Sequence, residues 1–119
     1  MNDRLSLLLG TTVTVQIDRP VGYVHGDVVY PVNYGFLPGL MGGDGEEQDA
    51  YVLGPQEPLE QFTGRVIAVI RRSDDVEDKL VVADENEWYS RERILESVRF
   101  IEQYFDSRVQ TLSEDEDER

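Results

Sequence analysis

Acidic residues are concentrated in two short segments of the chain. The first, GGDGEEQDAYVL, holds four acids within six residues: Asp44, Glu46, Glu47 and Asp49. The second, SDDVEDK, holds four within five: Asp74, Asp75, Glu77 and Asp78. Carboxylates packed this closely repel one another by about a kcal/mol per close pair at effective protein dielectrics, unless a cation offsets the charge. A site for a hard divalent cation, which prefers carboxylate oxygens, would account for both segments together.

The spacing in the first acidic segment supports a metal site. Asp44 and Asp49 bracket a glycine turn, and Asp49 leads directly into an apolar strand that would fix its direction. Alternation along the segment could then point Asp44, Glu46 and Asp49 inward. Mg²⁺ takes few protein carboxylates and favours phosphate oxygens among its other ligands, so such a pocket implies a phosphate substrate. From the residues alone, solvated polar turns in an acidic protein remain the alternative.

Composition excludes several classes of function. The chain has 119 residues and a mass of 13.6 kDa, which fits one domain. Its formal charge of -14 and pI near 4.2 would repel nucleic acid and an anionic membrane surface. The absence of cysteine excludes disulfides, thiolate nucleophiles, zinc fingers and iron–sulfur clusters. No apolar run approaches the roughly 20 residues that span a bilayer, and we therefore expect a cytoplasmic protein without a nucleic-acid or membrane partner.

The hydrophobic pattern predicts a small, mainly β domain. Strands are expected at 12–18, 27–36, 50–53, 64–71 and 79–83, with the second confined to a sheet edge by Pro31 and a Gly/Pro-rich loop at 37–45. Five strands in so short a chain favour a closed or partly open barrel.

A single C-terminal helix is expected to pack on this barrel. Ser90 can cap it by accepting from a backbone N–H. Apolar residues then recur at helical spacing: Ile94, Leu95, Val98, Ile101, Tyr104 and Phe105. We assign 1–112 to one domain and predict a disordered acidic tail over 113–119, where five of seven residues are acids.

Three ordered motifs resemble the soluble (family I) inorganic pyrophosphatases. They are YPVNYGFLPG at 30–39, DGEEQDAYVLGP at 44–55 and GRVIAVIRRSDDVEDKLV at 64–81. Family members are similar in carrying a YPxNYG segment, a DGDPxD-type loop and an acidic turn ending in Asp-x-Lys. The resemblance covers roughly residues 12–105. It implies an OB-like barrel that forms a homo-oligomer. It also implies hydrolysis of inorganic pyrophosphate with Mg²⁺ as the cofactor, for which Mn²⁺ could substitute.

The resemblance also implies roles for individual residues. By position, the family's metal ligands correspond to Asp44, Asp49, Asp74 and Glu77. Glu46 stands where the family has an aspartate proposed to help activate water. The phosphate-contacting residues correspond to Lys79, Tyr34 and Tyr104. Two of these acids, Glu46 and Glu77, replace family aspartates and so add a methylene each.

Much of the family's basic clamp is missing. Thr14, Gln16 and Gly22 stand where the family has Lys, Glu and Arg, and Phe105 stands in place of a Lys. Losing one donor to a transferring phosphoryl group typically costs on the order of 10²–10³ in rate. Three readings stay open: a weak pyrophosphatase, an enzyme for another phosphorylated substrate, or a noncatalytic protein that binds a divalent metal or a phosphorylated ligand. Basic side chains that could compensate are Arg19, Arg71 and Arg72, whereas His25 is expected to be an ordinary surface residue.

Overall fold

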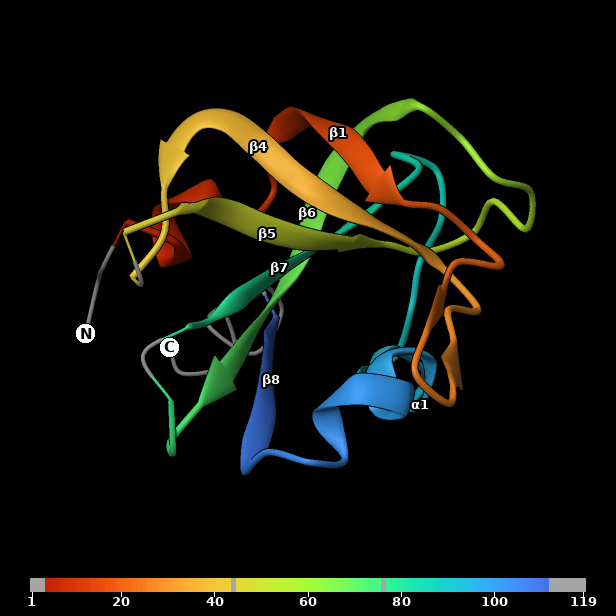
Figure 1. Ribbon diagram of the computed structural model, residues 1–119. Helices are drawn as coiled ribbons and strands as arrows, with labels where there is room; N and C mark the ends of the chain where they lie inside the picture. The colour runs from red at the N-terminus through yellow and green to blue at the C-terminus, as the bar shows by residue number, and fades with distance from the viewer. Residues whose placement is uncertain (1–3, 44, 76, 112–119) are drawn as a thin grey trace.

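The computed structural model describes residues 4–43, 45–75 and 77–111. Its elements are a 3₁₀ turn Ser6–Leu8, β1 Thr12–Arg19, β2 Val24–His25, β3 Val28–Val29, β4 Asn33–Met41, β5 Glu47–Val52, β6 Gln61–Arg72, β7 Lys79–Ala83, α1 Arg91–Glu102 and β8 Ser107–Thr111. Five strands pair in the order β1-β4-β5-β7-β6, and β6 pairs again with β1. The sheet therefore closes into a five-stranded barrel (Figure 1), as the sequence predicted.

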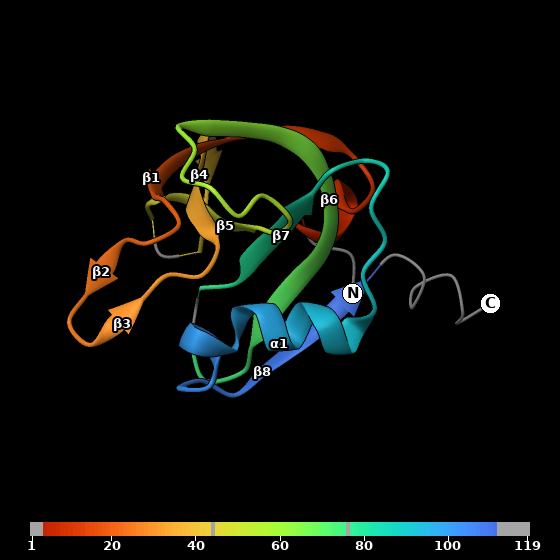
Figure 2. The same cartoon turned by 90° about the vertical axis from the view of Figure 1, so that its right-hand side faces the viewer.

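The barrel has two apolar layers because side chains alternate along each strand. Ala50, Val52, Leu80 and Val82 belong to the cluster that fills the barrel interior. The intervening residues of the same strands face outward, where α1 covers them. This outer cluster comprises Tyr51, Leu53, Ala68, Ile70, Val81, Ile94, Val98 and Val109. Figure 2 shows α1 below the barrel, beside β8.

The start of the helix agrees with the sequence-based prediction, whereas Leu95 of the predicted apolar face is exposed. Ser90 adopts an extended conformation, and its hydroxyl accepts from the backbone N–H of Arg93 at 3.1 Å. The buried positions of α1 are Ile94, Val98 and Glu102. Helix α1 ends at Glu102, so Tyr104 and Phe105 lie in the following turn and outside the helix, contrary to the prediction.

Three segments differ from the sequence-based prediction. Residues 37–41 extend β4 instead of forming a loop, because a register shift between Leu37 and Met41 accommodates the Pro and Gly residues. The predicted strand at 27–36 is divided between β3 and β4, and β3 pairs with β2 in a separate projecting hairpin (Figure 2). A further strand, β8, follows the helix and pairs with the C-terminal half of β6. The proposed tail at 113–119 lies outside the described residues.

Two residues of the YPxNYG segment have structural roles. A Cβ on Gly35 would lie 1.9 Å from the carbonyl oxygen of Gln16, so only glycine lets β4 approach β1 this closely. The fully buried Asn33 accepts from the backbone N–H groups of Val21 and Leu59 and donates to the carbonyl of Glu57. Asn33 thus holds two loops to the start of β4.

Strand pairing brings the two acidic segments to one end of the barrel. Strand β5 begins within the first segment at Glu47, and β7 begins at Lys79, the last residue of the second. The two strands are parallel, with Ala50 opposite Leu80. The preceding residues, Asp49 and Lys79, are therefore neighbours on the outer face. Tyr34 joins the same face, because it is paired with Tyr51 across β4 and β5.

Candidate functional site

The ammonium of Lys79 lies between carboxylates of the two acidic segments. Lys79 Nζ donates to Asp49 Oδ2 at 2.7 Å and to Glu77 Oε1 at 3.0 Å. The Lys79 side chain is only 5% exposed, whereas the two carboxylate side chains are 29% and 27% exposed. A positive charge thus offsets the repulsion between the two acids, and both carboxylates still reach solvent.

Tyr34 completes this cluster from β4. Its hydroxyl donates to Asp49 Oδ2 at 2.9 Å, and Lys79 Nζ lies 5.6 Å from the centre of its ring. Burial, followed by the negative charge of Asp49 and the hydrogen bond to it, raises the pKa of Tyr34 far above its ordinary value. The hydroxyl therefore stays protonated at neutral pH and acts as a donor.

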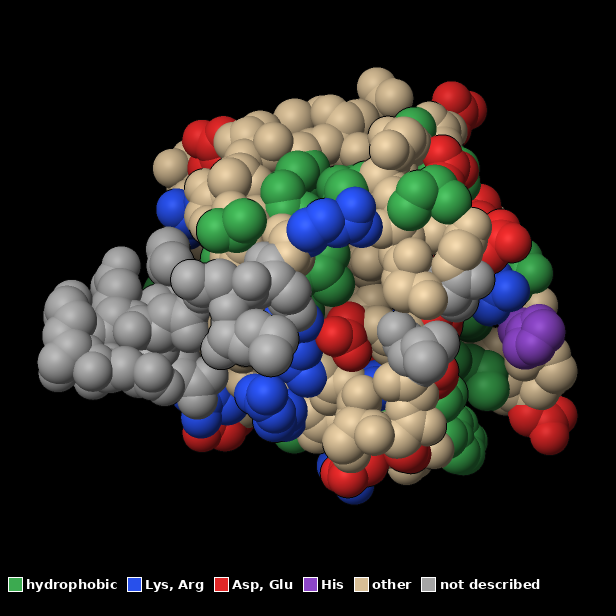
Figure 3. Space-filling model, turned by 90° about the vertical axis from the view of Figure 1, so that its left-hand side faces the viewer, with side chains coloured by type: hydrophobic (Ala, Val, Ile, Leu, Met, Phe, Trp, Pro, Cys, Tyr) green, Lys and Arg blue, Asp and Glu red, His purple; other side chains and the backbone are tan. Residues whose placement is uncertain are grey.

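The two acidic segments line one small surface depression. Its lining includes Glu47, Gln48 and Asp49 of the first segment together with Glu77, Asp78 and Lys79 of the second. On this side of the molecule, described acidic side chains lie interspersed with Lys and Arg side chains (Figure 3). Convergence of the segments, on which the predicted site depends, is therefore a feature of the fold.

Two residues near this depression were not singled out by the sequence analysis. Gln48 is 2% exposed, and its amide donates to the carbonyl of Asp78 at 2.7 Å, which ties the two acidic segments together. Gln48 is in phase with the interior positions Ala50 and Val52, a signal that could have identified it. Asp18 lies at a register shift between Ile17 and Arg19. Burial and the charge of nearby Asp49 raise the pKa of Asp18.

Three other predicted site residues have exposed side chains. Glu46 is exposed on the first segment. Asp74 is exposed, and its carboxylate accepts from the backbone N–H of Asp106 at 3.1 and 3.2 Å. Tyr104, in the turn after α1, is 69% exposed. Asp44 lies outside the described residues.

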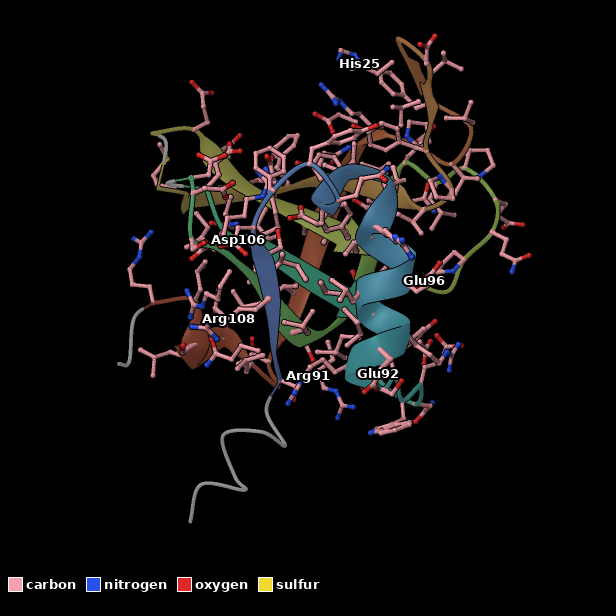
Figure 4. All side chains as sticks on the ribbon, turned by 90° about the horizontal axis from the view of Figure 1, so that it is seen from below. His25, Arg91, Glu92, Glu96, Asp106 and Arg108 are labelled. Atoms are coloured by element: carbon pink, nitrogen blue, oxygen red, sulfur yellow. The ribbon has the colours of Figure 1, made fainter. Side chains whose placement is uncertain are left out.

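The candidate compensating arginines lie in three separate environments. Arg19 donates to the hydroxyl of Tyr30 at 2.6 Å. Arg71 donates to Asp78 Oδ2 at 3.0 Å. Arg72 is buried against Glu102. His25 lies on the projecting β2–β3 hairpin with an exposed side chain, far from the labelled Asp106, which precedes β8 (Figure 4).

The donor chemistry of Asp49 and Glu77 fits Mg²⁺. Within 4–43, 45–75 and 77–111, no three His, Cys, Asp or Glu side chains are grouped so as to hold a metal ion. Asp49 and Glu77 nevertheless converge on one cation, the ammonium of Lys79. Mg²⁺ is commonly held by one or two carboxylates, with water and substrate phosphates as its remaining ligands. This pair is therefore sufficient in number and in donor type.

Comparison with known proteins decides the family. Residues 11–117 match the protein-family model for inorganic pyrophosphatase. The chain belongs to the inorganic pyrophosphatase family. This pyrophosphatase-family chain is 33% identical to the inorganic pyrophosphatase of Corynebacterium efficiens over 82 residues. The aligned region covers 60% of this chain and 52% of that one. It is 36% identical over 52 residues to the enzyme so named from Caulobacter vibrioides, covering 39% and 29%. The chain thus spans about half or less of these relatives.

Solved structures share the pyrophosphatase barrel. The inorganic pyrophosphatase of Helicobacter pylori matches with a TM-score of 0.61 and 19% identity, over 84% of this chain and 82% of that one. The one from Ehrlichia chaffeensis matches with a TM-score of 0.64 and 16% identity, over 92% and 91%. At these identities the likeness concerns the fold.

None of the described helical segments combines the length and apolar content that crossing a membrane requires.

Proposed function

We propose that this chain hydrolyses inorganic pyrophosphate to two phosphates in a Mg²⁺-dependent reaction, at a rate below that expected with a complete basic clamp. The observation that carries the proposal is the meeting of Asp49, Glu77, Lys79 and Tyr34 at one partly exposed position. Family membership supplies the substrate class. Mn²⁺ is the expected substitute for Mg²⁺.

Each residue has a role in this proposal. Asp49 and Glu77 would hold the ion, with Asp44 as a further ligand and Asp74 reserved for an additional ion. When bound, Mg²⁺ would lower the pKa of a coordinated water and offset charge on the phosphoryl group. Glu46 is exposed and would accept a proton from the attacking water.

Lys79 and Tyr34 would stabilise the departing phosphate. Lys79 carries a positive charge at the site, and Tyr34 carries a hydroxyl that remains protonated. Tyr104 is proposed as a second hydroxyl donor, and its exposed side chain leaves it free to turn toward a bound substrate. Donors directed at developing charge are typically worth on the order of 10²–10³ in rate each.

The proposed rate is low because uncharged residues stand where the family has a Lys, a Glu and an Arg. Thr14 bonds Thr63 across β1 and β6 at 2.8 Å, and Gln16 donates to the carbonyl of Glu60 at 3.2 Å. Gly22 has a φ of 92°, a conformation that strains other residues. Arg72, with a side chain 3% exposed, does not present its charge to solvent.

The decisive experiment measures phosphate release from pyrophosphate with and without Mg²⁺. The wild type is expected to release phosphate only with Mg²⁺, and Asp49→Asn should lower the rate by at least about 100-fold. Glu96→Gln is the matched control, since Glu96 is exposed on the side of α1 away from Asp106 (Figure 4). Absence of turnover in the wild type would reject the catalytic proposal.

A noncatalytic phosphate- or metal-binding protein is the second candidate. It is favoured by one observation: Lys79 is already paired with both Asp49 and Glu77 without any added ion. Such a protein would show a higher melting temperature with millimolar Mg²⁺ or phosphate but no phosphate release.

For either candidate, we propose a cytoplasmic homo-oligomer. Light scattering of the purified chain would measure the oligomeric state.

A further inference from the structure

Arg72, the last residue of β6, is held largely by groups that have no role in the proposed reaction. Its Nε donates to Glu102 Oε1 at 3.0 Å and its Nη2 to Glu102 Oε2 at 2.6 Å. Its Cζ lies 3.7 Å from the centre of the Phe105 ring. Nε and Nη2 of Arg72 are thus paired with Glu102, and the side chain is only 3% exposed.

Glu102, the last residue of α1, is itself held in place. Its side chain is 1% exposed and also accepts from the hydroxyls of Tyr51 and Ser107. Burial acts to raise the pKa of Glu102, but the hydrogen bonds from Arg72, Ser107 and Tyr51 outweigh burial and leave this pKa below its ordinary value. The carboxylate is therefore charged at neutral pH and forms a fixed anchor for the guanidinium.

The remaining edge of the Arg72 guanidinium faces the second acidic segment. Nη1 lies 3.3 Å from Asp75 Oδ2 and 3.7 Å from Glu77 Oε1. That Glu77 oxygen is the one that accepts from Lys79 Nζ at 3.0 Å. A continuous run of charge contacts thus leads from the end of α1 through Arg72 and Glu77 to Lys79 and Asp49.

We propose that Arg72, anchored by Glu102, is a positioning residue that holds Glu77 at the Lys79–Asp49 cluster. A planar guanidinium can bond a carboxylate with two nitrogens and still present a third to another group, which a lysine ammonium does not do with the same geometry. Binding of a divalent cation at Asp49 and Glu77 then depends on the end of α1. This inference rests on the proposed function for the ion, but the placement of Glu77 can be measured independently.

The test must separate positioning from stability. Arg72→Met alone leaves Glu102 as an unpaired buried charge and is expected to destabilise the fold. Combining it with Glu102→Gln removes both charges, and the glutamine oxygen can accept from one of the Tyr51 and Ser107 hydroxyls while its Nε2 donates to the other. The double variant should therefore recover most of the lost melting temperature. It should still bind Mg²⁺ about 10- to 100-fold more weakly than the wild type in titration calorimetry.

A second readout does not depend on any ion. In the unliganded double variant, the NMR order parameter of the Glu77 amide should fall from near 0.85, typical of a rigid backbone, to below about 0.6. Arg72→Lys in the wild-type background should lower this order parameter as well, because lysine keeps the charge but lacks the planar guanidinium that bonds Glu102 with two nitrogens and presents a third. The control is the exposed pair on α1, changed as Arg99→Met with Glu96→Gln, which should alter neither readout.

The outcomes are distinct. If the double variant keeps wild-type order at Glu77, Arg72 is a structural residue only and the inference is overturned, whatever the activity. If the wild type neither binds Mg²⁺ nor releases phosphate, the proposed function fails, and the order parameter alone decides the inference. Reduced order at Glu77 together with weakened Mg²⁺ binding supports both.

Discussion

Asp49 and Lys79 face each other across the parallel pair of β5 and β7, with Lys79 Nζ 2.7 Å from Asp49 Oδ2. They are 30 residues apart in the chain. The Lys79 side chain is only 5% exposed, and its ammonium is paired with acids of both segments. Repulsion between the two segments is thus offset within the protein itself.

Asp49 should stabilise the fold even without a ligand. Asp49→Asn removes the charge partner of a buried ammonium, and we expect the free energy of unfolding to fall by about 1–3 kcal/mol in urea denaturation. Glu96→Gln breaks only an exposed pair with Arg99 and should change it by less than about 0.5 kcal/mol. A more stable Asp49→Asn variant would show that repulsion, and not pairing, dominates at this position.

Removing the Tyr34 hydroxyl should affect catalysis more than folding. The Tyr34 ring contacts Tyr30 and Tyr51 edge-on, and phenylalanine preserves these contacts. Tyr34→Phe is expected to lower kcat by about 10²-fold or more if the hydroxyl stabilises departing phosphate. Tyr23→Phe on the other side of Tyr30 is the control. Unchanged kcat in Tyr34→Phe would remove Tyr34 from the proposed mechanism.

Acid should destabilise the protein partly through Glu102. Hydrogen bonds to Glu102 hold its folded pKa below the ordinary value of 4.5, despite burial. Its contribution is therefore fully present above about pH 4.5 and is lost as the pH falls through the lower folded pKa. The free energy of unfolding, measured from pH 7 to pH 3, should fall less steeply at the acid end in Glu102→Gln. Parallel curves for the two proteins would contradict this account.

Gly35 should tolerate no side chain. Gly35→Ala places a Cβ 1.9 Å from a backbone oxygen of Gln16, which cannot move without separating β1 from β4. We expect a loss of more than about 3 kcal/mol or failure to fold. Gly26→Asn is the control, because Gly26 has a φ of 62° with open space around it, and asparagine adopts this conformation readily. The melting temperatures of the two variants test the contrast.

The sequence was sufficient to predict the elements that depend on local pattern. Alternation of apolar residues located β1, the apolar run KLVVA located β7, and the Ser90 cap with its apolar spacing located the start of α1. The five-stranded barrel is confirmed. Strand β8 was not foreseen, because a short SRVQT run has little apolar alternation and becomes a strand by pairing with β6. The extension of β4 was missed because Gly and Pro usually mark loops.

For the site, the sequence by itself determined which chemistry is present: two acidic segments, a lysine at the end of the second and a tyrosine in a YPxNYG segment. Tertiary structure decided which of these groups meet. The parallel register of β5 and β7 joins Asp49 to Lys79, and the end of α1 brings Glu102 to Arg72, again 30 residues away. Such contacts depend on strand register and helix placement, which are set by packing of the whole chain and not by neighbours in sequence.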